Sequence, residues 1–193
     1  MHEHDVLCFG ETMAMFVAEQ VGDLAQVGQF GKRIAGADSN VAIGLSRLGF
    51  KVRWLSRVGD DSLGRFVLDS LRREGLDCTD VEIDRKHPTG FQLKARCDDG
   101  SDPAVEYFRR GSAASRLSTA LLSPACLQAS HLHATGIPLA LSDSCRALSH
   151  ALVDAMRVSP GIWPNWRSSG ALTVRLMTSG LAPGYRVCTW MVG

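Results

Sequence analysis

The chain has 193 residues, of which 45% are hydrophobic and 21% charged, and its formal net charge is +1 at pH 7. This composition excludes a disordered chain and gives no sign of a general affinity for nucleic acid or another polyanion. No apolar run reaches the length of about 18 residues that a membrane span needs. The polar start of the chain carries no secretory signal, which predicts a cytoplasmic location.

Strand and helix signals alternate over the first 154 residues, as they do in an α/β fold. In chain order they predict a strand at 6–10, a helix at 40–48, a strand at 52–57, a helix at 62–74, strands at 81–83 and 129–135, and a helix at 142–156. Ser62 is the expected N-cap of the second helix, and Gly75 lies just past its end.

Four further segments alternate polar and apolar residues over short lengths. They lie at about residues 13–18, 29–34, 89–96 and 104–109. Such alternation is typical of strands with one solvated face, so we expect a small exposed sheet beside the main one.

The cysteines and histidines give no metal or disulfide motif. Six cysteines are spread without a Cys-x-x-Cys pair, and without a secretory signal they predict reduced, part-buried thiols. His131 and His133 could place two imidazoles on one strand face, but no third ligand is spaced to join them. We interpret them as a pair in a core strand and predict no metal site.

The most informative pattern lies within residues 34–64. Small residues and Gly36 open it, so backbone can approach a ligand where a side chain would collide. Asp38 and Asn40 then place a carboxylate and an amide at the start of a helix, which suits a ligand with many hydroxyl groups. The alternative is that Asp38 or Ser39 caps the helix and binds no ligand.

Two blocks of the chain resemble, in order, the signature of the ribokinase-like (PfkB-type) carbohydrate kinases. The first block consists of Ala35, Gly36, Asn40, Gly49 and Val58-Gly59-Asp60-Asp61. The second consists of Thr89-Gly90-Phe91-Gln92-Leu93 and Tyr107-Phe108-Arg109-Arg110-Gly111-Ser112-Ala113. Its aromatic-aromatic-Arg run before Gly-Ser-Ala is most similar to the 2-keto-3-deoxygluconate kinases. The resemblance covers roughly residues 4 to 156.

The resemblance implies a fold, an activity and partners. Residues 1–156 would form the N-terminal part of a three-layer α/β/α kinase fold, and the four alternating segments would form a lid over the sugar. The implied activity is ATP-dependent phosphorylation of a sugar or sugar acid, with ATP and Mg²⁺ as cofactors. The implied partners are the small-molecule substrate and a second copy bound through the lid, with no nucleic acid and no membrane.

The resemblance also implies a substrate site. Gly36, Asp38 and Asn40 would face sugar hydroxyls, while Tyr107 and Arg109 alternate onto one strand face and would contact the keto-acid. An arginine suits a carboxylate because it can donate two parallel hydrogen bonds. The alternative for Arg109 is a solvated cation that protects a strand edge.

Two departures from the family pattern leave the substrate open. Gln92, which we count among the substrate-binding residues, stands where many 2-keto-3-deoxygluconate kinases carry a tyrosine, and Phe108 stands where they carry a second one. A neutral ketose or another aldonate therefore remains an alternative substrate.

Residues 157–193 differ from the rest in composition. All 20 acidic residues lie at or before Asp154, whereas the tail holds four arginines and three of the four tryptophans and has no Asp, Glu, Lys or His. The family carries an Asp-Pro-Asn-x-Arg segment and, later, its catalytic Asp in Gly-Ala-Gly-Asp. Neither motif occurs here, so we assign no catalytic residue and expect no ATP site within these residues.

We hypothesise that the reading frame was lost near codon 157. Translation of a GC-rich gene in a wrong frame gives a tail rich in Arg, Trp, Gly and Ser.

The alternatives to a truncated kinase are a sugar-binding module without chemistry and a remnant without function.

Overall fold

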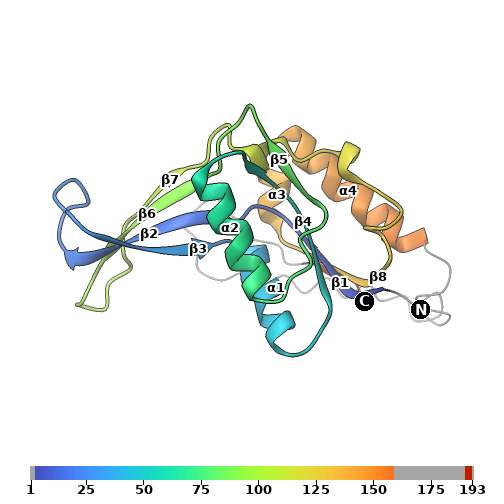
Figure 1. The fold of residues 1–193 in the computed structure, drawn as a ribbon, viewed down its shortest axis with the longest axis horizontal. Coiled ribbons are helices and arrows are strands. Elements are labelled where there is room, and N and C mark those ends of the chain that lie inside the picture. The colour runs from blue at the N-terminus through green and yellow to red at the C-terminus, as the bar shows by residue number, and fades with distance from the viewer. Residues whose placement is uncertain (1–2, 159–189, 193) are drawn as a thin grey trace.

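The computed structural model describes residues 3–158 and 190–192, which form two sheets and the helices around them (Figure 1). The main sheet has the strand order β5-β4-β1-β8-β9. Its strands are β1 (His4–Phe9), β4 (Val52–Gly59), β5 (Val81–Asp84), β8 (Ala129–Ala134) and β9 (Trp190–Val192). Neighbouring strands are parallel except for β9, which pairs antiparallel with β8.

The smaller sheet projects from one end of the main one (Figure 1). Its order is β3-β2-β6-β7, with β2 (Met13–Val21), β3 (Phe30–Ala35), β6 (Phe91–Arg96) and β7 (Val105–Phe108). We call this sheet the lid. β2 and β6 pair in parallel at its centre, and the hairpin partners β3 and β7 lie at its edges. The lid occupies the four segments whose alternation predicts a small exposed sheet.

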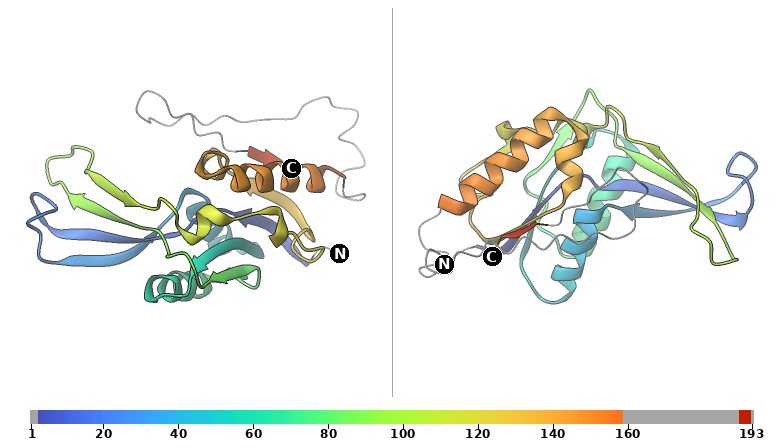
Figure 2. Two further views of the ribbon diagram at one scale, coloured as in Figure 1. Left: turned by 90° about the horizontal axis from the view of Figure 1, so that it is seen from above. Right: turned by 180° about the vertical axis from the view of Figure 1, so that it is seen from behind.

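Helices cover both faces of the main sheet (Figure 2). One face carries α1 (Ala37–Arg47) and α2 (Ser62–Arg73), and the other carries α4 (Asp143–Val158), which follows the short α3 (Gly136–Leu141). Successive residues of β1 alternate between the two faces. The three layers confirm the predicted α/β/α fold class.

Each face of the main sheet has its own hydrophobic core. Val6 and Cys8 of β1 pack with Trp54, which is fully buried, on the side of α1 and α2. Leu7 and Phe9 pack on the side of α4. The predicted apolar face of α4 is confirmed, because its members lie in this second core: Cys145, Leu148, Leu152 and Met156.

The lid is held by aromatic contacts and by Ile34 of β3, which packs against the core on the side of α1 and α2. The rings of Phe91 and Phe108 stack with centroids 4.6 Å apart, and Phe16 meets Phe91 edge-on at 6.1 Å. Lys32 places its Nζ 4.1 Å from the centre of the Phe66 ring, which joins the lid to α2. These contacts fix the lid against the helical layer.

Asp61, and not Ser62, caps α2, so the prediction for Ser62 is wrong. The backbone of Asp61 is extended, with φ −138°, and its Oδ1 accepts a hydrogen bond from the N–H of Gly64 at 2.7 Å. Its Oδ2 accepts a second from the N–H of Thr89 at 2.8 Å. Gly75 follows the end of α2 with φ +83°, as expected for a helix C-terminus.

The described residues contain neither a membrane-spanning helix nor a disulfide bond. None of their helices is long and apolar enough to cross a membrane. The five cysteines among them, Cys8, Cys78, Cys97, Cys126 and Cys145, are unpaired. The sixth cysteine, like most of the acid-free tail, lies outside the described residues.

Replacement of Asp61 by alanine tests the cap. Because Asp61→Ala removes the acceptor of two backbone N–H groups, we expect it to lower the free energy of unfolding by about 2 kcal/mol. The matched variant Ser62→Ala should change it by less than about 0.5 kcal/mol. Urea denaturation measures both, and equal losses for the two variants would contradict the assignment.

Candidate functional site

The candidate site lies at the carboxyl ends of β1 and β8. The chain runs from β1 to β4 and β5 on one side of the sheet and then returns to β8 on the other, so the strand order reverses between β1 and β8. In open α/β sheets, ligands bind outside the carboxyl ends of the strands at such a reversal. α1 begins at this edge, and the lid strands leave the main sheet there (Figure 1).

Gly36 lets α1 begin very close to the end of β1. A Cβ at this position would lie 2.6 Å from the carbonyl oxygen of Glu11 and 2.5 Å from Oγ of Ser39. Side chains larger than hydrogen therefore do not fit without movement. Gly36 is also the N-cap of α1 and has no side chain to bond the first N–H groups of the helix.

Asp38 is buried beneath the start of α1. Its side chain is among the largest that are fully buried, at 1% exposure. Oδ1 accepts a hydrogen bond from the N–H of Thr135 at 2.9 Å, and Oδ2 accepts one from the Thr135 hydroxyl at 3.0 Å. Asp38 thus ties α1 to the end of β8, while the N-cap residue of α1, Gly36, provides no side-chain hydrogen bond.

The buried surroundings of Asp38 favour the neutral protonation states of Asp38 and of the titratable side chains beside it. Burial raises the pKa of Asp38 to about 7, against the two hydrogen bonds from Thr135, which lower it. Nε2 of His133 lies 3.9 Å from Oδ1 of Asp38, and burial lowers the pKa of this histidine. Cys8, opposite His133 in the sheet, has its pKa raised to about 12, mainly by burial. In the described residues no three such side chains are grouped to hold a metal.

Asn40 lies one helical turn after Gly36, on the same face of α1. Its side chain is exposed, and within the described part of the chain it has no hydrogen-bond partner. Its backbone N–H donates to the carbonyl of Gly36 at 2.9 Å. The amide of Asn40 is therefore available to a ligand at the sheet edge.

The lid contributes the second half of the candidate site. Gln92 of β6 is opposite Tyr107 of β7, and the two share one face of the lid. Gln92 is 6% exposed and Tyr107 is 59% exposed. Arg109 follows β7, and its Nη2 lies 2.6 Å from Oε2 of Glu11. Arg109 is therefore directed to the end of β1, in contrast to the alternative of a solvated edge cation.

Glu11 is the residue of this site that the sequence patterns missed. It lies two residues after the end of β1, and its side chain is only 1% exposed. Its Oε1 accepts a hydrogen bond from the Ser112 hydroxyl at 2.6 Å. The available signal was an acidic residue placed directly after a buried strand and a glycine, which is where parallel sheets present polar groups.

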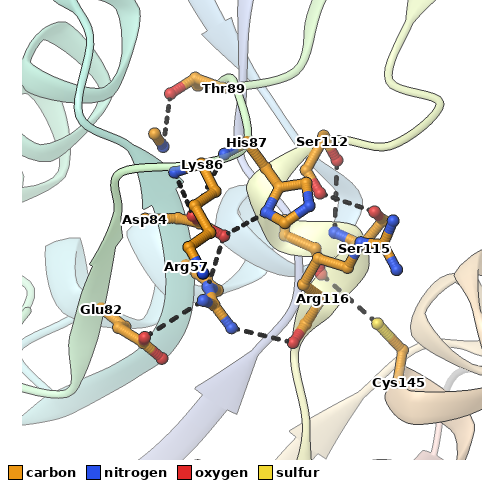
Figure 3. A network of polar contacts seen from close by, with 12 residues as sticks. Arg57, Glu82, Asp84, Lys86, His87, Thr89, Ser112, Ser115, Arg116 and Cys145 are labelled. Carbon is orange, nitrogen blue, oxygen red and sulfur yellow. Dashed lines mark hydrogen bonds and ion pairs between the residues drawn. The ribbon is translucent and has the colours of Figure 1, made fainter.

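A polar network anchors the segment that follows Arg109 (Figure 3). Arg57 of β4 donates from Nη1 to the carbonyl of Arg116 at 3.2 Å, and its Nε lies 3.0 Å from Asp84 of β5. On the other side, the Cys145 thiol of α4 donates to the carbonyl of Ala114 at 3.4 Å. These contacts hold the 3-10 helix η1 (Ala113–Arg116) between β4 and α4 and so fix the adjoining turn.

The chain matches a known protein family. Residues 3–170 match the model described as the pfkB family of carbohydrate kinases. The 2-dehydro-3-deoxygluconokinase of Bacillus subtilis is 44% identical over 174 residues, which cover 83% of this chain and 53% of that protein. The resemblance deduced from the two sequence blocks is thereby confirmed.

Solved structures share the fold. The crystal structure of the PfkB protein from Polaromonas sp. JS666 is 48% identical, with a TM-score of 0.77 over 80% of this chain and 52% of that one. A sugar kinase from Pyrococcus horikoshii, solved in complex with ATP, is 22% identical, with a TM-score of 0.66 over 80% of this chain and 50% of that one. The chain spans about half the length of these relatives.

Substitution of Asp38 tests its buried state through pH. A pKa of about 7 in the folded protein, against an ordinary value of 3.8, means that the folded state binds the proton more tightly. Its stabilising effect is complete below pH 4 and is lost as the pH rises through 7. Between pH 5 and 8 the free energy of unfolding should therefore fall by about 2 kcal/mol more in the wild type than in Asp38→Asn. Parallel urea-denaturation profiles for the two proteins would contradict this.

Proposed function

The chain belongs to the pfkB family of carbohydrate kinases, and from that premise we propose that it forms the sugar-binding half of a kinase for a sugar acid such as 2-keto-3-deoxygluconate. The observation that carries the proposal is the position of Arg109. This cation lies at the end of β1, in the same site as the start of α1. A carboxylate bound by Arg109 would leave the hydroxyl groups of the same molecule within the reach of α1.

Arg109 suits an acidic substrate because donors remain on its guanidinium. Nη2 contacts Glu11, whereas Nε has no hydrogen-bond partner among the described residues. The side chain is 24% exposed, so it is partly open to a ligand. A guanidinium binds carboxylates with defined geometry, which supports a sugar acid over a neutral sugar. The similarity to 2-dehydro-3-deoxygluconokinase, whose name denotes the same keto-acid, supports the same choice.

The other predicted residues have distinct parts in this proposal. Backbone N–H groups that follow Gly36 and the free amide of Asn40 bind sugar hydroxyls. Gln92 and Tyr107 cover the sugar from the lid face. Asp38 acts through the position of α1, since its side chain is buried and both of its carboxylate oxygens are bonded to Thr135.

We infer that the reaction of the whole kinase transfers the γ-phosphoryl group of ATP to a hydroxyl of the bound sugar acid. The family membership supports this inference, and the Pyrococcus horikoshii relative was crystallised with ATP. In the described residues no group of acidic, histidine or cysteine side chains suits Mg²⁺, so we assign no metal ligand. A homodimer through the lid and a cytoplasmic location stay predictions.

Calorimetry with Arg109→Ala tests the substrate class. Loss of a hydrogen bond to a charged group costs about 1.5 to 3 kcal/mol, so the affinity for 2-keto-3-deoxygluconate should fall by at least about tenfold. The affinity for fructose, a neutral ketose, should change little. Arg110→Ala is the matched control, since Arg110 is exposed and adjacent. If the wild type binds fructose and not the acid, or if Arg109→Ala weakens both equally, the acidic substrate is wrong.

We also propose that the reading frame changes near codon 157. The support is compositional: no acidic residue follows Asp154. Translation of the encoding DNA in the two other frames should give an Asp-Pro-Asn-x-Arg segment and, later, Gly-Ala-Gly-Asp. The absence of both motifs from both frames would reject a frame change.

A further inference from the structure

Glu11 contacts each of the segments that meet at the end of β1. A Cβ at Gly36 would lie 2.6 Å from its carbonyl oxygen, so its backbone touches the start of α1. A Cβ at Gly90 would lie 2.6 Å from its Oε1, so its side chain touches the entry to β6. Its carboxylate contacts Arg109 and Ser112, which follow β7. The main sheet, α1 and both lid excursions thus meet at one residue.

The carboxylate of Glu11 is almost fully enclosed. Burial raises the pKa of Glu11, while the charge of Arg109 and the hydrogen bond from Ser112 act in the opposite direction. Oε1 is bonded to Ser112 and Oε2 is paired with Arg109, both at 2.6 Å. A buried carboxylate that loses one partner is strongly destabilised, because the charge cannot be solvated. This cost holds the Arg109 side chain in one orientation.

The orientation leaves part of the guanidinium without a partner. An arginine has five N–H donors, and Glu11 is paired with Nη2. Nε is buried and has no hydrogen-bond partner in the described part of the chain. An unpaired buried donor is costly, so an anion bound at Nε would remove an existing penalty.

We propose that Glu11 is the positioning residue that directs the free donors of Arg109 to the substrate carboxylate. The inference rests on the proposed function, because it assigns Glu11 to the recognition of the same sugar acid. Glu11 itself does not touch the substrate. Its negative charge also balances Arg109 in the free protein, so the site favours a ligand that satisfies the geometry of the remaining donors over a simple anion.

The test compares Glu11→Gln with Glu106→Gln, which removes the same charge from an exposed position of β7. In calorimetry, Glu11→Gln should weaken 2-keto-3-deoxygluconate about tenfold and leave fructose within about twofold, since one lost ionic contact corresponds to about one decade in affinity. Glu106→Gln should leave both affinities unchanged within about twofold. Equal binding of the acid by wild type and Glu11→Gln would overturn the inference.

A second measurement does not depend on substrate. In ¹⁵N–¹H spectra of the free chain, the Nε–H signal of Arg109, assigned by its loss in Arg109→Ala, should exchange slowly with water. Glu11→Gln should accelerate this exchange at least about tenfold, because a neutral amide holds the guanidinium less firmly. An unchanged rate would reject the positioning role, whatever the wild type binds. If the exchange accelerates as expected but the wild type binds no sugar acid in calorimetry, the proposed function alone fails.

Ser112→Ala keeps the inference testable if Glu11→Gln does not fold. This variant removes the hydroxyl that holds Oε1 and retains the ion pair. It should accelerate Nε–H exchange by a smaller factor, about twofold to fivefold, as the carboxylate gains freedom. Exchange at the wild-type rate in Ser112→Ala, with the near-ultraviolet circular dichroism unchanged, would contradict the role of Glu11.

Discussion

The close approach of separate backbones at the end of β1 is the constraint on which the candidate site depends. Gly36 and Gly90 have no room for a side chain, because Glu11 lies against both. Two buried carboxylates, Glu11 and Asp38, then bond groups that follow other strands of the fold. In the low dielectric of an interior such groups must be fully paired, so their partners are held in place. The site is rigid for the same reason that it is closely packed.

Local patterns were sufficient for most of the secondary structure. The apolar spacing of α4 and the glycine after α2 depend on residues within a few positions of one another, so the sequence alone predicts them. The folded chain uses Asp61 as the cap of α2 in place of Ser62. The reason is not local: the second carboxylate oxygen of Asp61 also accepts a hydrogen bond from the N–H of Thr89, 28 positions later. β9 has three residues and no periodicity, so no pattern predicts it.

The candidate site could be predicted only in part, because its decisive contacts join distant positions. The motif identified Gly36, Asp38 and Asn40, but the burial of Asp38 depends on Thr135, 97 positions away. Likewise, the carboxylate of Glu11 is held by a hydrogen bond from the Ser112 hydroxyl, 101 positions away. His131 and His133 show the same limit, since the two alternate residues of one strand differ: His133 lies beneath Asp38 and His131 is exposed. Alternation predicts a face of a strand but not what covers it.

The lid consists of two excursions of the chain from the main sheet, β2–β3 and β6–β7. Each excursion leaves the main sheet and returns to it near the same edge (Figure 1). The residues that order the parallel strands therefore occupy different stretches from those that form the lid. Mutations, insertions and deletions in the lid can accumulate without a change of register in the core. This separation makes the architecture evolvable: one frame can accept many lids, and selection can alter the lid while the packing of the frame stays intact.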